Sequence, residues 1–524
     1  MAQGAQLIAA QKDFTAGLVT TRGGLLCPKN GAMKLQNAMV HLGGFRKLYG
    51  TTKKNTNAIA SKAVTSMYKA YVGAKSCLLA SAGTVMYYSN DNGATWTSLI
   101  TGLTENAPWT FVTINGYVFC TNGSDTERRI DITVLPTYAP TVTNMTGKPA
   151  YKCKVFFLAA GRVWAAINST EPDTVYFCDV DGDGIATPET WPTANWLSFP
   201  TDSTSEQITG AGVWKDNPVI FTEHTLSLIL GSNEFEFQQP LMDNRIGCGA
   251  YRTVANLGDD VVFMGKDRRI YLFDGGRVYC ISDDIQPEIT DINATYITSS
   301  HAVTDEYAYY LFYVSTAATG TVCNRMLMFD TRLNQIVGNI IKAGWTGPHT
   351  ISAASAIQLT GTGDNGELYY GDSGATGFVH RFMDPTSTDF STSAINMVVE
   401  TRDWDFAEEG IGSLAIMKEF EEIITIAPVE GAYTVTPGYA MDGNTTFTDL
   451  TGISLVSVGY FFGDRDPTSA TRTTVVYPSK LTASGTPRVS AWFGRFRWVQ
   501  NGTGCACIIN GYEIRASQAR PVRR

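Results

Sequence analysis

Charged residues are scarce in this chain, and positive charge is not in excess. Asp, Glu, Lys and Arg make up 17% of the 524 residues, and the formal net charge is −9, whereas globular proteins average roughly 25% charged residues. Low charge with 44% apolar residues indicates a protein that buries much of its surface, in its own core or against partners. Because a protein that grips phosphates needs clustered Lys and Arg, the composition argues against nucleic-acid binding. An acidic wall could still let DNA pass, since it repels the backbone.

Long hydrophobic runs and a dense cysteine framework are also missing. The most hydrophobic stretch, 307–314, is far too short to span a bilayer, and residues 1–20 lack the charged and apolar regions of a signal peptide. The ten cysteines are scattered along the chain, which favours a reducing compartment over a disulfide scaffold. We therefore expect no membrane segment and assembly in a cytoplasm.

Catalytic signatures are not found. None of the five histidines lies in a hydrolase or zinc-protease motif, and no glycine loop for nucleotides is present. Cys505 and Cys507 lie on one face of a predicted strand, but no second pair with zinc-ligand spacing accompanies them. The sequence predicts no enzyme activity, no catalytic residue, no cofactor and no zinc site.

Short strands joined by tight polar turns are what the chain has instead. In 208–285, two similar units follow each other. Each has an apolar strand, a turn (215–218 and 258–260), a second strand (219–221 and 261–264) and an alternating third strand. Gly, Asn and Asp tolerate the positive φ that tight hairpins need, so both units predict antiparallel meanders.

The same pattern recurs from about residue 65 with a spacing of about 40–50 residues, which is typical of a β-propeller. Turn-then-strand segments begin the successive units at 83–88, 116–119, 161–164, 217–221, 268–273, 325–329 and 366–370. We predict an all-β fold with a propeller of six or seven blades over 58–390. A β-sandwich array could supply similar strands, but it should repeat less regularly.

Two further segments flank the predicted propeller. Residues 1–57 form short extended pieces, and we expect an arm that packs on the propeller or on a partner. Around 383–395 the chain becomes rich in Ser, Thr, Pro and Asp, which indicates a boundary. Residues 391–524 then show new strand patterns with Asp-Gly-Asn and Asn-Gly turns, and we predict a β-sandwich-like domain there.

An Asp-box pattern occupies residues 89–96. Ser89 and Asp91 would hold the turn, Gly93 would supply a positive φ, and Trp96 would pack beneath it. Sialidases contain such boxes as structural turns away from the active site, so we interpret the motif as a structural hairpin.

A second acidic motif runs from Asp179 through Asp181 to Asp183 and resembles the start of a calcium loop. Position 12 of that loop would be Thr190 instead of a bidentate Glu, and Glu189 stands one residue early. No helical pattern flanks the segment. We favour an acidic surface turn and keep calcium binding as the alternative.

Taken in order, several segments resemble the tail hub family (also called nozzle or packaged-DNA stabilisation proteins) of bacteriophages with short tails. The segment 42–50, preceded by Asn37, is similar to the entry segment of that family. Residues 190–222, from Thr-Trp through Ile-Thr-Gly to Val-Ile-Phe-Thr, resemble a second signature, and 246–282 resemble a third. The C-terminal 494–497 and 513–514 resemble the last sandwich hairpin.

The resemblance implies a structural virion protein with no catalytic role. It implies a homo-oligomeric ring, usually of six copies, below the head-to-tail adaptor. Such a ring lines the DNA exit channel, holds tail fibres or spikes, and contacts a plug or needle. Double-stranded DNA would pass without specific binding, and the protein would reside in the virion tail after assembly in the host cytoplasm. We hypothesise that acidic turns such as 179–183 and 259–260 face the channel.

Two alternatives remain at this stage. One is a glycan-binding or glycan-cleaving propeller of sialidase type, although its arginine cluster and paired carboxylates are not visible in the sequence. The other is a bacterial surface adhesion propeller, which the lack of a signal peptide disfavours. A propeller fold is shared by structural proteins and enzymes, so the fold alone decides nothing.

Overall fold

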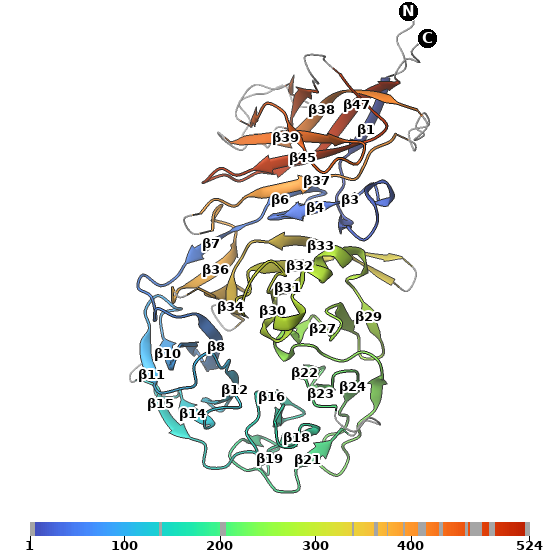
Figure 1. Ribbon diagram of the computed structural model, residues 1–524. Coiled ribbons are helices and arrows are strands. Elements are labelled where there is room, and N and C mark those ends of the chain that lie inside the picture. Colours follow the sequence, from blue (N-terminus) through green and yellow to red (C-terminus); the bar gives the residue numbers. More distant parts are fainter. Residues whose placement is uncertain are drawn as a thin grey trace, which may run out of the picture.

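The computed structural model places strands in two regions, a ring of small sheets and a second region of longer strands (Figure 1). It describes residues 6–135, 139–199, 206–337, 340–360, 365–374, 376–390, 393–406, 416–428, 433–455, 460–461, 474–481 and 488–518. Within these ranges the α-helix is limited to α1 (Gln286–Asp291), and short 3-10 turns make up the other helical pieces. The all-β prediction is confirmed. None of the described helices has the length and apolarity needed to cross a membrane.

Seven antiparallel meanders of four strands make up the ring in the described part of the chain. In chain order their strands are β8 (Val64–Val72), β9 (Lys75–Ala82), β10 (Val85–Ser89) and β11 (Thr97–Ile100); β12 (Thr110–Ile114), β13 (Tyr117–Thr121), β14 (Arg128–Asp131) and β15 (Thr141–Asn144); β16 (Val155–Ala159), β17 (Arg162–Ala166), β18 (Thr174–Phe177) and β21 (Trp196–Ser198); β22 (Gly210–Trp214), β23 (Asn217–Phe221), β24 (Leu226–Leu228) and β25 (Leu241–Asp243); β26 (Ala255–Leu257), β27 (Asp260–Met264), β28 (Ile270–Phe273) and β29 (Val278–Cys280); β30 (His301–Thr304), β31 (Ala308–Tyr313), β32 (Arg325–Val337) and β33 (Ile340–His349); and β34 (Ala353–Gln358), β35 (Leu368–Asp372) and β36 (Val379–Asp384) with β7 (Gly50–Lys53).

The first strands of these meanders contact one another in a closed cycle. β8 contacts β12, β12 contacts β16, and the contacts continue through β22, β26, β30 and β34 back to β8. Figure 1 shows the same circular order. The last meander takes its outer strand from the N-terminal arm, because β7 pairs with β36. The seventh sheet is therefore completed by a strand that lies before the first meander in sequence.

Neighbouring sheets share a hydrophobic core. Phe221 of the fourth sheet and Phe263 of the fifth lie with ring centroids 4.6 Å apart, and buried residues of the first and second sheets form another shared cluster. A sheet that packs on both faces buries the odd-numbered and the even-numbered side chains of each strand. The sequences of its strands are therefore continuous apolar runs, without strict alternation of apolar and polar residues. This explains the fully buried β17, β28 and β31.

The turns follow the predicted chemistry with one correction. Lys215 and Asp216 both have positive φ (44° and 67°), and so does Gly258 (63°); two successive positive φ values match the twist of a two-residue hairpin. The predicted turn at 215–218 is too long, because β23 already begins at Asn217 and Pro218 pairs with Val213.

The N-terminal arm contributes strands to both regions. Besides β7, it includes β1 (Gln6–Gln11), β2 (Gly17–Leu18), β3 (Gly31–Ala32), β4 (Lys34–Gln36), β5 (Ala38–His41) and β6 (Gly44–Lys47). β4 lies between β33 of the ring and β37 (Met397–Glu400) of the second region. One sheet of ten strands therefore runs without a break from the ring into the second region.

The second region consists mainly of two sheets that pack on each other, and it also contains a small sheet of order β46 (Ile508–Ile509), β6 and β5. One has the order β1, β47 (Gly511–Gln518), β38 (Lys418–Pro428), β43 (Thr474–Lys480) and β42 (Tyr460–Phe461), with β44 (Val489–Ala491) paired to β38. The other continues from β37 through β45 (Gly494–Gln500) and β39 (Thr434–Met441) to β40 (Thr448–Asp449), with β41 (Ile453–Ser454) on β39, while β46 (Ile508–Ile509) pairs with β6. Trp498 and Tyr512 meet between the sheets at 4.8 Å. The expected boundary at 391 lies at residues outside the described part of the chain.

Candidate functional site

The Asp-box residues form a tight hydrogen-bonded turn after β10. The Ser89 Oγ hydroxyl donates to Asp91 Oδ1 (2.7 Å) and accepts from the Gly93 backbone N–H (2.9 Å). The Thr95 N–H donates to Asp91 Oδ1 at 2.9 Å, and the Trp96 indole donates to the Gly93 carbonyl at 3.0 Å. Gly93 has a φ of 88°. The side chains of Ser89, Asp91 and Trp96 bond within the turn, while Asn92 Oδ1 accepts from Lys69 Nζ of β8 at 2.8 Å, so the motif is a structural element of the first sheet.

The turn lowers the pKa of the Asp91 carboxyl. Burial alone would raise this pKa, but the hydrogen bonds from Thr95, Ser89 and Ala94 together outweigh the effect of burial, so the net shift is downward. The carboxylate is therefore held ionised as an acceptor, which is the state that binds the turn amides best.

The acidic motif lies in the hairpin of β19 (Asp179–Val180) and β20 (Ala186–Thr187). Asp181 Oδ1 accepts from the backbone N–H groups of Asp183 (3.0 Å) and Ile185 (2.9 Å). Asp179 lies 3.8 Å from Arg162. Glu189, one residue before the loop position that calcium needs, instead accepts from Thr146 N–H at 2.8 Å. Among the described residues, no group of three or more His, Cys, Asp or Glu side chains is placed to hold a metal ion.

The remaining sequence candidates are scattered. Cys505 and Cys507 are both buried, and the Cys505 thiol donates to the Thr503 carbonyl. His224 faces Glu206 at 2.9 Å on the surface, and the buried His349 bonds Thr346 at 3.2 Å. These residues are not brought together, so they form no common site.

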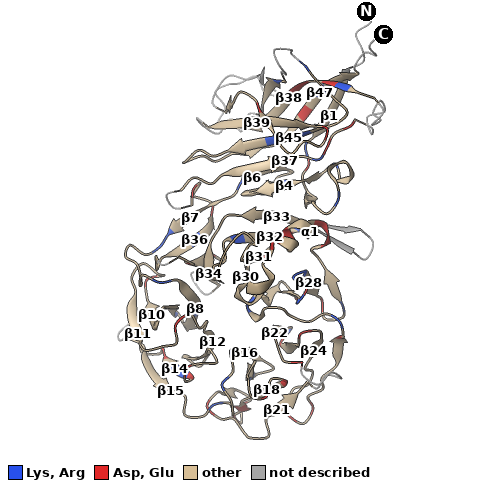
Figure 2. Ribbon diagram, in the orientation of Figure 1, with Lys and Arg blue, Asp and Glu red and all other residues tan. Residues whose placement is uncertain are grey.

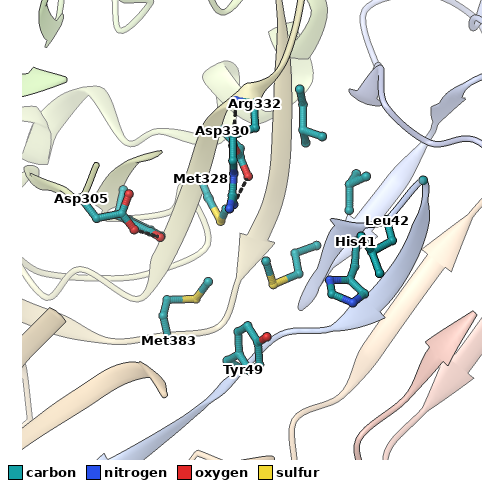
Figure 3. A pocket seen from close by; sticks show the side chains of 13 residues that line it. His41, Leu42, Tyr49, Asp305, Met328, Asp330, Arg332 and Met383 are labelled. Atoms are coloured by element: carbon teal, nitrogen blue, oxygen red, sulfur yellow. Dashed lines mark hydrogen bonds and ion pairs between the residues drawn. The ribbon is translucent and has the colours of Figure 1, made fainter. Parts of the chain in front are cut away.

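A pocket of about 580 Å³ opens between the arm and the sixth and seventh sheets (Figure 3). The arm supplies Met39, Val40, His41, Leu42, Gly43 and Tyr49, and the sheets supply Asp305, Tyr310, Met328, Asp330, Arg332, Leu333 and Met383. Leu42, at the tip of the β5–β6 hairpin, is 84% exposed.

The charged groups of this pocket are paired with each other. Arg332 donates to both oxygens of the buried Asp330 (2.9 and 2.6 Å). The Tyr310 hydroxyl donates to Asp305 at 2.8 Å. Hydrogen bonding to Asp330 raises the pKa of Arg332. These polar groups are therefore bound to one another, and the pocket surface is about as polar as it is apolar.

A second cavity of about 440 Å³ lies at the centre of the ring. All seven inner strands or their entry residues line it, through Ser66, Met67, Trp109, Thr110, Val155, Phe156, Phe157, Ala211, Gly212, Val213, Tyr251, Arg252, Val254, Ala255, Asn256, His301, Ala302, Ser355 and Ala356. Arg252 is the charged residue of this lining.

Arg252 reaches across this cavity from the turn before β26. Its Nη2 donates to the backbone carbonyls of Thr65 (3.1 Å) and Ala354 (2.8 Å), which belong to the first and seventh sheets. Burial lowers the pKa of Arg252. The side chain thus links the two sheets between which the ring closes.

His301 lines the same cavity from β30. It is 2% exposed, stacks on Phe312 at 5.0 Å, and places Nδ1 3.5 Å from the Ser299 carbonyl. Burial, with a smaller effect from the nearby Arg252 charge, lowers the pKa of His301 well below its ordinary value. Its ring is therefore neutral.

The sequence analysis missed both cavity residues. Arg252 stands in no motif, and His301 was only one of five scattered histidines. The cavity draws on seven strands spread from residue 66 to residue 356, so no local pattern could reveal it.

Charged positions are scattered over both regions (Figure 2). The hairpins that join the first and second strands of neighbouring sheets, however, carry several carboxylates. Ala160 N–H donates to the Asp216 carbonyl (2.8 Å), and Lys215 pairs with Asp259 (3.2 Å). Successive hairpins are thus linked along one rim. Burial and the neighbouring Asp274 and Asp259 charges raise the pKa of Asp260, so carboxylates crowd at this rim.

Comparisons with known proteins do not identify the chain. It matches no family model and no curated protein.

Proposed function

We propose that this protein is a structural component of a bacteriophage tail, a tail hub or nozzle subunit that forms a ring below the head-to-tail adaptor. In this proposal the seven meanders are the blades of a β-propeller over 58–390, and the two packed sheets are a β-sandwich-like domain over 391–524. Six copies would surround the DNA exit channel and anchor tail fibres, spikes or a needle. The architecture follows the order that the resemblance implies: an arm, a ring of blades, and a second β region.

The observation that carries the proposal is the continuous sheet that joins the two regions. β4 bonds to β33 on one side and to β37 on the other, and β1 of the same arm pairs with β47. A connection through sheet hydrogen bonds and a shared core makes one stiff body, whereas domains joined only by a linker move independently. A stiff subunit suits a tail part that must hold its neighbours in register while DNA passes.

The crowded carboxylates support DNA passage as the role of one rim. Asp260 lies near the Asp274 and Asp259 charges, which raise its pKa, although Lys215 pairs with Asp259. A surface with such an excess of carboxylates would repel the DNA backbone and keep it mobile. This supports the hypothesis that acidic turns face the channel. A map of the assembled ring that places Asp259 on its outer circumference contradicts that hypothesis.

The assembly state tests the proposal. Light scattering and negative-stain microscopy should show rings of about six copies, or monomers that form rings when the adaptor is added. A strict monomer that ignores the adaptor and cleaves a labelled sialoside or polysaccharide overturns the proposal in favour of a glycan-cleaving propeller.

A further inference from the structure

The loop between β24 and β25 holds an aromatic side chain out in solvent. Phe235 is 91% exposed, the highest value for a large apolar side chain in the described part of the chain. Leu230 and Gln238 close the base of the loop, because the backbone N–H of each donates to the carbonyl of the other (2.9 and 2.7 Å). The Phe235 N–H donates to Asn233 Oδ1 at 3.1 Å, and Phe237 packs on two aromatic rings of the third sheet, both at 5.3 Å. Phe235 is therefore a fixed, exposed knob, and binding it costs little ordering.

Leu42 is a second exposed apolar side chain, and it lies at the pocket between the arm and the sixth and seventh sheets. It is 84% exposed, and its φ of 50° is a left-handed conformation that is unfavourable for a bulky residue. Met383, which lines the same pocket (Figure 3), also has a positive φ (53°), at an irregularity in the pairing of β36. Strained backbone of this kind is concentrated at binding sites, so this pocket is the place where a partner is expected.

The pocket suits an aromatic knob in size and chemistry. Its volume of about 580 Å³ lies within the range of about 300–1,000 Å³ that ligand pockets span. Met39, Met328 and Met383 contribute three thioethers to the lining. Thioether sulfur makes favourable contacts with aromatic rings, so a phenyl ring would find matching partners there.

The charges beside the knob and beside the pocket are of opposite sign. Glu234 is held by an ion pair inside its own chain, whereas Glu236 is exposed. Arg332 lines the pocket with its side chain 55% exposed, and the Arg46 guanidinium lies 3.7 Å from the centre of the Tyr49 ring, which also lines it. The two carboxylates of the pocket already accept hydrogen bonds within the chain. An acidic loop tip therefore meets accessible positive charge at this pocket.

We propose that Phe235 of one copy of this chain enters the pocket of a second copy, with Glu236 placed against Arg332. The loop is fixed on the fourth sheet, and the pocket lies between the arm and the sixth and seventh sheets, so Phe235 does not reach the pocket of its own chain (Figure 1). Because knob and pocket lie on different parts of the surface, the contact is head-to-tail, and such contacts close into a ring or extend into a filament. The closed form rests on the proposed tail hub ring, and the contact specifies how its neighbours meet.

Photo-crosslinking tests the contact directly. Benzoylphenylalanine replaces Phe235 in one batch of chains, and a second, isotope-labelled batch keeps the native residue. The two batches are mixed under associating conditions, with and without the adaptor, and irradiated. Benzophenone reacts preferentially with C–H bonds beside the sulfur of methionine, so position 235 should become joined to Met39, Met328 or Met383 of the labelled chains. Mass spectrometry of peptide pairs with mixed labels identifies these crosslinks.

Variants test the contact without the probe. Phe235→Ser should weaken association about tenfold or more, as expected for a central aromatic anchor. Leu42→Gly should also weaken association, but it should not lower the Tm of the single chain, because glycine adopts the positive φ without strain. Leu26→Ser is the matched control, since Leu26 is a 73% exposed leucine of the arm that does not line the pocket, and association should be unchanged. Sedimentation velocity measures all three.

Several results overturn this inference. They are crosslinks from position 235 to other segments, to the adaptor, or within single chains only, and unchanged association of Phe235→Ser. Closed rings with crosslinks elsewhere leave the tail hub proposal standing, whereas crosslinks to the pocket in open filaments support this contact and contradict the ring. A chain that stays monomeric with and without the adaptor overturns both.

Discussion

At the scale of single residues, the Asp260 carboxylate next to the β26–β27 turn lies where its ionisation lowers the stability of the folded protein. The Asp260 carboxylate makes no hydrogen bond to the described residues, and burial together with Asp274 and Asp259 raises its pKa above the ordinary 3.8. A raised folded-state pKa means that ionisation costs the folded protein free energy at all pH values above that pKa. The cost fades as the pH falls through the folded-state pKa.

Asp260→Asn should therefore stabilise the protein at pH 7. We expect a gain of about 0.5 kcal/mol, after allowing for solvent screening at this partly exposed group, and no gain near pH 3. Urea unfolding at both pH values measures it. Asp274→Asn is the control and should destabilise, because Asp274 accepts from the Gly276 and Arg277 N–H groups at 2.8 Å. A less stable Asp260→Asn protein at pH 7 contradicts the argument.

The cysteines should be almost unreactive in the folded protein. All ten are free and nine are buried; Cys280 is partly exposed, and burial raises its pKa to about 11. Because the thiolate is the reactive form, a disulfide reagent at pH 8 should label Cys280 slowly and the others hardly at all. Adding denaturant should release all ten, counted by absorbance. Rapid labelling of several thiols in the native protein speaks against this packing.

Local turn chemistry was predictable from sequence, whereas the central cavity was not. The Asp-box turn depends on groups within eight residues, from Ser89 to Trp96, and its hydrogen bonds follow from residue type alone. The environment of Arg252 depends on the carbonyls of Thr65 and Ala354, which lie 187 and 102 residues away from Arg252 in the sequence. Such contacts follow from the cyclic arrangement and not from any neighbouring residue.

At the scale of elements, β7 is held by more than its pairing with β36. Thr51 of β7 is 1% exposed, and its N–H donates to the Asp389 carbonyl, in the segment after β36, at 2.9 Å. Thr51→Pro removes this donor and should cost about 3 kcal/mol, whereas Thr51→Ala keeps the backbone donor and should cost much less. Urea unfolding of the two variants separates the backbone contribution from the side-chain contribution. Equal losses would show that this backbone hydrogen bond is not essential for holding β7.

The repeat itself was predictable, but the strand positions were not. The seven turn-then-strand segments read from the sequence fall in seven different sheets. Four of them, including β13 and β17, are second strands, while three, including β10 and β28, are third strands. Every strand buried on both faces is equally apolar, so hydrophobicity marks a unit but not the place of a strand within it.

At the scale of the whole molecule, the arm should make unfolding cooperative. Leu35 is fully buried and pairs with Gly347 on one side and Val399 on the other. Calorimetry of the wild type should show one transition. Leu35→Pro should split it in two, because proline cannot keep the pairing on both sides. Lys34→Ala, which only removes a surface ion pair of 3.6 Å with Glu400, should leave one transition. Two transitions in the wild-type protein contradict this coupling.

The pairing of β1 with β47 also determines how late in synthesis the sheet that contains β1 can form. Gln6 pairs with Ser517, so β1 finds its partner only after roughly 500 further residues have been synthesised. At about 5–20 residues per second, roughly 500 residues take about 25–100 s to synthesise. Throughout that time β1 is an open strand edge, the kind of surface that recruits other chains. We therefore expect the open edge of β1 to need protection from other chains during synthesis. Slower translation should increase aggregation of the protein, even though the finished fold is unchanged.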